Sequence, residues 1–354
     1  MTYTESWNAQ SGVLKRRGRA DRNADGSPGA PPDSSARDAL VYGEYKPDAT
    51  TTGVLPGTSL TNYNASSVNE LIITTPGTTI SNMRIYGDIK IRAANVTIQN
   101  CELVGGNNTA TGTSGVVDCN SSACFNAIIK DCDINPRLPS LNRDGIIGHE
   151  YTALRCHVRG TIDGFGVYND PSSGGSQNAN VTLKGNYVHD LMYYYPDYKN
   201  GVSGVTWHTD GTHNDACQIQ GGANIYLIGN RLVATSFAGS NSGTNPDKPL
   251  LIGTGNSNGA SLVVQKNVGT LNNVVIEKNW FEGGLAEVNA KPGAYTLQNN
   301  IFSRNVAKYS GWSGYWIRID SRADTTITGL LTNRWEDTNE LMTEPRTSGI
   351  HYNA

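Results

Sequence analysis

The chain has 354 residues, a formal net charge of -3 and only 17% charged residues. It therefore offers no general basic field for binding nucleic acid, and no apolar run approaches the roughly 18 residues that membrane insertion requires. A polar, mostly uncharged chain dotted with aromatic residues suits a carbohydrate partner better. We find no cofactor motif and expect no cofactor.

Residues 1–50 differ from the rest of the chain. The stretch from Ser11 to Leu40 is rich in Gly, Pro, Ser, Asp and Arg and has no hydrophobic periodicity, which predicts an extended or disordered arm. Its basic part, Lys15–Arg19, is either a docking peptide that becomes ordered on a partner or a solvated linker. The first residues carry charges where a secretory signal has its apolar stretch. This favours a protein assembled in the cytoplasm, such as a virion component, although a chain whose signal had been removed would look the same.

In the remainder, residues 51–354, a short phrase recurs in one register. Each copy alternates apolar and polar residues, which is typical of a half-buried strand, and leads to one fixed small residue and a second apolar stretch. Aligning the copies places nine residues in one column: Met83, Cys101, Cys132, Cys156, Asn186, Asn230, Asn279, Asn300 and Asn333. The smallest spacings, 18 residues (Met83 to Cys101) and 21 (Asn279 to Asn300), match one coil of a parallel β-helix. The larger spacings match a coil plus a loop, or two coils.

The column predicts a tight turn between two faces of the solenoid. Its asparagines would hydrogen-bond to one another along the axis, and its three cysteines would form a ladder of free, buried thiols. Cys119 and Cys124 flank a short loop and leave two alternatives, a disulfide-closed ring or two thiols, whereas Cys217 has no evident partner. Because helix signals are nearly absent, the sequence predicts an all-β parallel solenoid.

A second set of short strands lies between the copies and would form another face. The clearest are Asp144–Glu150, Asp163–Asn169, Asp215–Gly221, Leu285–Asn289 and Trp316–Asp320.

The entry Thr51–Leu60, coils such as Asn95–Asn100 and the segment His213–Asn230 carry a family resemblance. On these residues the chain resembles right-handed parallel β-helix proteins of the pectate-lyase-like superfamily, most of all phage tail spikes, minor tail proteins and actinobacterial β-helix repeat proteins. The resemblance covers roughly residues 51–354 and implies a homotrimer. Lyases, hydrolases, epimerases and tail spikes share this solenoid, so the fold alone does not decide the function.

Three aspartates fall at matching positions of the second strand set. Asp144, Asp163 and Asp215 each precede a small residue, and stacked coils would separate them by roughly 5 to 10 Å. That range includes the carboxylate separations of retaining and inverting glycosidases, in which one carboxyl has a raised pKa and acts as the acid. The structural alternative, that Asp-Gly pairs make the turn into each strand, fits Asp144 and Asp163 better than Asp215.

The densest group of chemically active side chains is Trp207–Asp215, with two histidines and two aspartates just ahead of a strand. His208 or His213 can act as a general acid or base near neutral pH, with Asp210 or Asp215 as its partner. Their spacing matches no specific metal motif, and we expect no metal. The alternatives are a surface loop with incidental histidines and a buried network that shapes the corner.

The outward positions of the second strand set predict a long groove for a polysaccharide. One outward column contains His149, Tyr168, Gln220, Asn289 and Asp320. The next contains Gln218, Glu287 and Arg318. Such amide, carboxylate and guanidinium groups match the hydroxyls of an extended sugar chain. The resemblance implies a lyase in which Arg318 would take the proton beside a uronate carboxylate, often with calcium, but no acidic cluster lies near it, so we rank hydrolase first.

Aromatic residues gather in Met192–Trp207 and Tyr309–Trp316. Trp207 and Trp316 are the candidates for stacking on sugar rings. Subunit contacts and loop packing are the alternatives.

These patterns predict a tail-spike-like protein of the phage tail. Its arm would dock to other virion tail proteins, and its groove would bind, and in one version depolymerise, a host cell-surface polysaccharide. The first alternative is a soluble, secreted bacterial polysaccharide hydrolase or lyase. The second is a non-catalytic structural tail protein whose Asp and His residues only shape turns.

Overall fold

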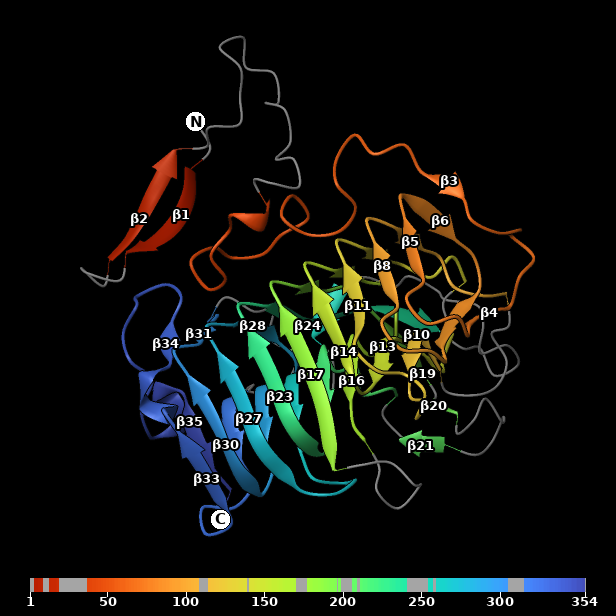
Figure 1. Cartoon of the computed structure of the whole chain (residues 1–354). Helices are drawn as coiled ribbons and strands as arrows, with labels where there is room; N and C mark the ends of the chain where they lie inside the picture. The colour runs from red at the N-terminus through yellow and green to blue at the C-terminus, as the bar shows by residue number, and fades with distance from the viewer. Residues whose placement is uncertain are drawn as a thin grey trace.

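The structure is a computed structural model that describes residues 3–8, 13–18, 37–107, 114–138, 140–169, 177–195, 197–198, 206–208, 211–240, 254–256, 259–304 and 315–353. Three sheets of nine, twelve and ten strands wind around one axis, and each coil adds one strand to each sheet (Figure 1). Strands of successive coils pair in parallel. This confirms the predicted all-β parallel solenoid.

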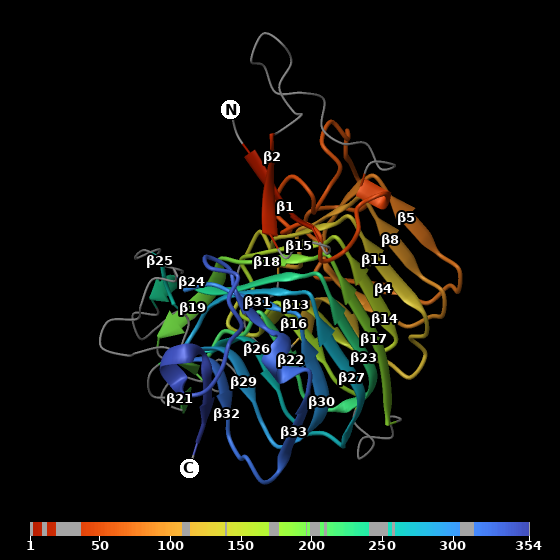
Figure 2. The same ribbon diagram turned by 90° about the vertical axis from the view of Figure 1, so that its left-hand side faces the viewer.

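The nine-stranded sheet and the ten-stranded sheet correspond to the first and second strand sets of the sequence, and Figure 2 shows them side by side around the axis. In spatial order the nine-stranded sheet consists of β5 (Thr79–Ser81), β8 (Thr97–Gln99), β11 (Ala127–Lys130), β14 (Tyr151–Leu154), β17 (Asn178–Lys184), β23 (Gly222–Ile228), β27 (Leu271–Glu277), β30 (Gly293–Gln298) and β33 (Thr325–Thr328). The ten-stranded sheet consists of β4 (Glu70–Ile73), β7 (Asp88–Ile91), β10 (Ser114–Cys119), β13 (Arg143–Gly148), β16 (Phe165–Val167), β22 (Cys217–Ile219), β26 (Ala260–Val264), β29 (Ala286–Ala290), β32 (Tyr315–Ile319) and β35 (Ile350–Tyr352).

The twelve-stranded sheet follows the turn that holds the repeat column. Its main path is β3 (Thr61–Asn62), β6 (Met83–Ile85), β9 (Glu102–Leu103), β12 (Asp133–Ile134), β15 (His157–Val158), β18 (Tyr187–Val188), β24 (Arg231–Ser240), β28 (Trp280–Gly283), β31 (Ile301–Phe302) and β34 (Arg334–Trp335), with β19 (Leu191–Tyr195) and β25 (Thr254–Asn256) added to β24. Two antiparallel pairs lie outside the three sheets: β1 (Tyr3–Asn8) with β2 (Val13–Gly18), and β20 (Asp197–Tyr198) with β21 (Thr206–His208). Two 3-10 helices, η3 (Leu330–Thr332) and η4 (Arg346–Ser348), follow late in the chain.

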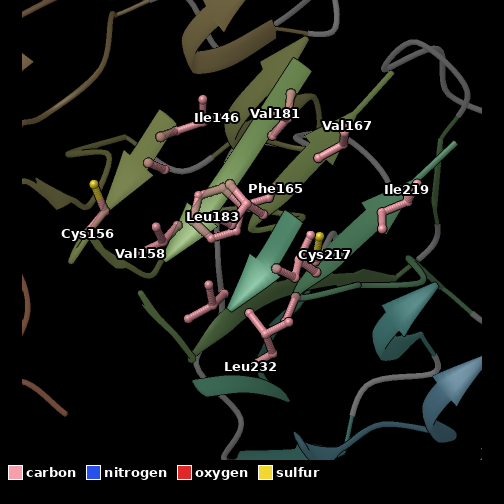
Figure 3. Packing of buried hydrophobic residues seen from close by; sticks show 14 of the residues in the cluster. Ile146, Cys156, Val158, Phe165, Val167, Val181, Leu183, Cys217, Ile219 and Leu232 are labelled. Atoms are coloured by element: carbon pink, nitrogen blue, oxygen red, sulfur yellow. The ribbon is translucent and has the colours of Figure 1, made fainter. Parts of the chain in front are cut away.

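The core is the space enclosed by the three sheets (Figure 3). In the ten-stranded sheet Ile146, Phe165 and Cys217 pair in register and point inward. Leu183 of β17 and Leu232 of β24 meet them from the other two sheets, and all five side chains are fully buried. Stacking each coil on its neighbours therefore buries the apolar face that a single coil would expose.

The predicted asparagine column lies at the turn between the nine-stranded and twelve-stranded sheets. The Oδ1 atom of Asn230 accepts the backbone N–H of Asn186 (3.0 Å) and its side-chain amide (2.8 Å). Asn230 repeats this pattern with Asn279 and also donates to the carbonyl of Leu183 (2.9 Å). The same bonds continue through Asn300 to Asn333, and the asparagines of this buried ladder are fully buried.

In the earlier coils thiols take the place of the amides in this column. Cys101, Cys132 and Cys156 are buried and free, as predicted. Cys119 and Cys124 are also free, so the alternative of a disulfide-closed ring is not formed. These side chains fill the core as small apolar groups.

A second, exposed ladder of asparagines runs along the opposite end of the nine-stranded sheet. Asn224 donates from Nδ2 to Oδ1 of Asn180 (2.9 Å) and accepts the amide of Asn273 (2.9 Å). These residues have positive φ, 60° at Asn224, which asparagine tolerates better than most residues. The sequence copies begin at these residues, but the sequence analysis did not recognise them as a ladder.

Residues 37–50 of the predicted arm lie against the solenoid, over the turn between the nine-stranded and twelve-stranded sheets. Arg37 is fully buried and Arg155 nearly so, and both face the carboxylate of Asp131, at 3.6 and 2.7 Å. Arg155 also pairs with Asp38 (2.7 Å). Because each cation has a carboxylate and further hydrogen bonds, a largely buried ionic network holds this segment, and the Tyr42 ring packs close to Gly185.

The buried ladder predicts a strong dependence of stability on its amides. Asn230→Ala leaves the backbone amide of Asn186 and the carbonyl of Leu183 without partners in the core, so we expect a loss of about 2–4 kcal/mol. Asn224→Gly, which suits the positive φ and removes only exposed bonds, should change stability by about 1 kcal/mol or less. Thermal and urea unfolding of both variants measures the contrast, and equal losses would contradict the ladder's role.

Candidate active site

The three predicted aspartates stack in one column at the entrance of the ten-stranded sheet. Oδ1 of Asp144 accepts the backbone N–H of Asp163 (3.3 Å), and Oδ1 of Asp163 accepts that of Asp215 (2.8 Å). Oδ1 of Asp215 in turn accepts the N–H of Ala260 (2.5 Å). Each carboxyl group thus accepts a hydrogen bond from the backbone of the next coil. This gives the aspartates a structural role, as in the Asp-Gly alternative, but the role is to join neighbouring coils.

Burial controls the protonation of this column. It raises the pKa of Asp144 to about 6 and that of Asp215 to about 7. Burial, followed by the charges of its two neighbours, raises the pKa of Asp163 well above the usual range. A carboxyl group with a pKa near 7 can carry a proton at neutral pH and donate it, which is what a general acid requires.

Asp215 is the member of the column that lines a pocket. The pocket has a volume of about 210 Å³ and collects six of the predicted site residues: His208, His213, Asp215, Gln218, Asn289 and Arg318. Gln265 and Lys291 also line it, and neither was among the predicted site residues. The residues come from β21, the segment after it and four successive strands of the ten-stranded sheet, so the coil stacking assembles the pocket.

A histidine and an aspartate form an oriented pair at one side of the pocket. Nδ1 of His208 lies 2.6 Å from Oδ2 of Asp197, and the His208 ring stacks on His213 with centroids 3.9 Å apart. Asp197 is buried, whereas the His208 side chain is 42% exposed. Because the carboxylate occupies Nδ1, proton exchange with a substrate would run through Nε2, the arrangement of a general base held by an orienting group. Asp197 was not predicted, because it lies in an excursion from the repeat.

The outward column of Gln218 also contains Gly166 and Val263, and the register of β29 differs by two residues from the prediction. Asn289 pairs with Arg318 and Val263, and so belongs to the column of Gln218. Lys291 occupies the level at which Asn289 was predicted, and its Nζ lies 2.6 Å from Oδ2 of Asp320. A shift of two residues keeps the same faces of a strand, so alternation alone could not reveal the error.

His149, Tyr168 and Gln220 do follow one another in the predicted column, where the pairing of β13, β16 and β22 places them. Beyond them the column continues through Gln265, Lys291 and Asp320. Gln220 donates to Oε1 of Gln218 (2.9 Å), which itself donates to Asp215. A chain of amides therefore leads from the outward face to the pocket.

Glu287 and Trp316 do not take the predicted outward positions beside the pocket. Glu287 is only 3% exposed, its Oε1 accepts the N–H of Gly283 (3.4 Å), and burial raises the pKa of its carboxyl well above the usual range. The burial corrects the predicted outward position of Glu287, because its side chain turns into the corner before β29. Trp316 packs edge-on against Trp335, with centroids 4.9 Å apart. Asp210 and the Trp207 side chain lie outside the described residues.

Part of the aromatic excursion is packed inside the protein. Met192 and Tyr194 of β19 form a small buried cluster with Leu141 and Ile162. Of the three alternatives for the aromatic segments (sugar stacking, subunit contacts and loop packing), loop packing applies to these residues. The excursion thereby holds β20 and β21 near the ten-stranded sheet.

Two searches for other kinds of site gave no result among the described residues. No group of three or more His, Cys, Asp or Glu side chains is arranged to hold a metal ion. Within the same part of the chain, no helix has the length and apolar character needed to cross a membrane.

The chain is similar to a solved structure, although no sequence family matches it. No protein-family model matches the chain, and no curated protein does. The crystal structure of an alginate lyase from Paenibacillus sp. str. FPU-7 aligns at 12% identity and a TM-score of 0.27, covering 83% of this chain and 93% of that one.

The raised pKa values of Asp144 and Asp215 predict how stability changes with pH. Both exceed the unfolded value of about 3.9, so the folded state binds more protons than the unfolded state between about pH 4 and 7. The stabilisation from these groups is complete at low pH and is lost as pH rises through about 6 and 7. Asp215→Asn removes one of them, so its melting temperature relative to the parent should be higher at pH 8 than at pH 4. A difference that is the same from pH 4 to pH 8, measured by thermal circular dichroism, would contradict the assignment.

Proposed function

We propose that the protein binds an extended polysaccharide along the outward face of the ten-stranded sheet and hydrolyses it at the pocket. The observation that carries the proposal is the Asp215 carboxyl group, with a pKa of about 7, in a pocket that also holds His208 and its partner Asp197. An acid and a separately oriented base are the two groups that hydrolysis of a glycosidic bond needs.

In this reaction Asp215 donates its proton to the oxygen of the leaving sugar. The breaking bond leaves positive charge on the anomeric carbon of the other sugar, and water attacks that carbon. His208 Nε2 accepts a proton from the water, and the Asp197 carboxylate stabilises the imidazolium that forms. Gln218, which donates to Oδ2 of Asp215, fixes the orientation of the acid.

Sugar binding would use the outward columns next to the pocket. Consecutive strands repeat every 4.8 Å or so, and each presents an amide, phenol or charged group: Tyr168, Gln220, Gln265, Lys291 and Asp320. Sugar hydroxyls both donate and accept, and they match such a row of mixed donors and acceptors. This row of side chains is therefore suited to a linear sugar chain rather than to one small sugar.

A second candidate reaction is β-elimination at a uronate sugar. Two observations favour it: Nε of Arg318 is buried in the pocket wall without a hydrogen-bond partner, 3.6 Å from Oδ1 of Asp320, and Lys291 adds a second cation. These cations could hold a uronate carboxylate while a base removes the neighbouring proton. Elimination produces an unsaturated sugar with ultraviolet absorbance, whereas hydrolysis does not.

We further propose that the protein works as a tail-spike-like homotrimer of a phage tail, with a host cell-surface polysaccharide as its substrate. The family resemblance of residues 51–354 supports this, and so does the composition of residues 1–36, which suits docking to another tail protein. Residues 37–50 are held on the solenoid, so the docking part would end near residue 36.

Removing the proposed acid tests the site. Asp215→Asn should lower release of reducing ends from a panel of bacterial surface polysaccharides by about 10²–10⁴-fold, because the amide cannot donate the required proton. The parent rate should fall as pH rises above about 7, where Asp215 loses its proton.

Asp144→Asn is the matched control, because it removes a carboxyl from the same column but not from the pocket. It should keep most of the activity. If both variants lose activity equally while remaining folded, the column acts through structure and Asp215 is not the acid. If the parent digest gains ultraviolet absorbance, the reaction is elimination and not hydrolysis.

The trimer is tested by the mass of the protein in solution. Sedimentation equilibrium of the full chain should give three times the mass of one chain at micromolar concentration. A monomer at this concentration would count against the tail-spike proposal and would favour a soluble polysaccharide hydrolase.

A further inference from the structure

A second group of histidines lies on the twelve-stranded sheet, away from the pocket. His157 of β15 and His189, just past β18, approach with their Nε2 atoms 2.7 Å apart. Each Nδ1 faces a carboxylate: His157 lies 3.0 Å from Asp133, and His189 lies 2.7 Å from Asp190. The proposed polysaccharide reaction uses none of these residues.

The two imidazole rings meet edge to edge. Their centroids are 4.9 Å apart and their planes differ by 23°. The centroid separation exceeds the Nε2–Nε2 distance by about two ring radii, so the line between the nitrogens passes nearly through both ring centres. This is the alignment of an N–H···N hydrogen bond rather than of two stacked faces.

The hydrogen bonds fix the number of protons. An ionised carboxylate only accepts, so both Nδ1 atoms must donate, and one Nε2 must donate while the other accepts. The His157–His189 pair therefore holds its observed geometry with one proton between the Nε2 atoms. A second proton would place two N–H groups head to head at a distance that fits only one, and the rings would have to separate.

The pair is connected to the segment that precedes the solenoid. Oδ2 of Asp133 accepts the backbone N–H of Val54 (3.0 Å), while its Oδ1 faces His157. Gly53 lies so close that a Cβ atom there would be 2.6 Å from Oδ1 of Asp133. Separation of the rings would therefore move the carboxylate that anchors residues 53–54.

Charged residues lie on the elements next to the pair, several of them close to Tyr187, which stacks on both rings. Asp48 and Lys46 come from the preceding segment, Glu102 from β9, Arg159 from the end of β15, Arg231 from β24 and Glu282 from β28. Arg231 lies over the ring of Tyr187, which itself stacks on both histidines, and it is paired with Glu282. The carboxylates favour a second proton on the pair, and the arginines oppose it.

We propose that the His157–His189 pair is an acid-sensitive latch: with one shared proton it holds the Asp133 carboxylate against the backbone of Val54, and a second proton loosens that contact. Gly53 and Leu55 keep their own bonds to Arg155 and Asn100. Acid would thus loosen one attachment of this segment without unfolding the coils.

Hydrogen exchange of the full chain tests the latch. After correction for the intrinsic pH dependence, exchange of the Val54 amide should accelerate about tenfold or more between pH 7 and pH 5, while amides of the buried ladder stay protected. Histidine nitrogen spectra at pH 7 should show both Nδ1 atoms protonated and one Nε2 proton for the pair. Two Nε2 protons or none at pH 7 would overturn the proposal, as would unchanged exchange in the parent.

His189→Gln separates the latch from a general effect of acid. A glutamine amide can donate to His157 Nε2 or accept from it, so the acid response of the Val54 amide should disappear. His157→Gln serves as a second variant if the first fails to fold, and His351→Gln, on β35, should respond as the parent does. A full acid response in either folded variant of the pair would overturn the proposal.

Discussion

The in-register stacking of side-chain amides between coils is the interaction on which the rest of the structure depends. At the turn between the nine-stranded and twelve-stranded sheets, each buried asparagine accepts two hydrogen bonds. They come from the backbone N–H and the side-chain amide of the asparagine in the previous coil. A coil displaced by one residue would bury these groups without partners, at a cost of one to several kcal/mol for each ladder step. The ladder therefore sets the rotation of the coils from Asn186 to Asn333, and with it the direction of their outward side chains.

The aspartate column joins successive coils of the ten-stranded sheet in a similar way, and this has a chemical consequence. A carboxyl group that caps the next coil must leave water, and burial then favours its protonated form. The feature that joins the coils thus also supplies an acid with a pKa near neutrality. Asp215 differs from Asp144 and Asp163 because the excursion that carries His208 and Asp197 covers it and shapes the pocket.

The sequence predicted what repeats and failed where the repeat is interrupted. The columns of asparagines and aspartates were predictable because period-two alternation and a fixed small residue recur in each coil. The register of Asn289 was not, because a slip of two residues preserves both faces of a strand. Asp197 lies in an excursion without a repeat, and the order of residues 37–50 comes from ion pairs of Arg37 and Arg155 with Asp131, which composition could not reveal.

A solenoid can carry such costly groups because its stability is a sum of local terms. Each coil contacts only its neighbours, so a buried carboxyl or a pair of opposed histidines weakens one interface and leaves the others intact. The aspartate column, the His208 pocket and the His157–His189 pair all fall in the middle coils. On the C-terminal side the amide ladder continues to Asn333, and on the N-terminal side Cys101 and Cys132 fill the same column with buried thiols. The titratable side chains of these three sites thus lie where regular coils on both sides hold the backbone in register.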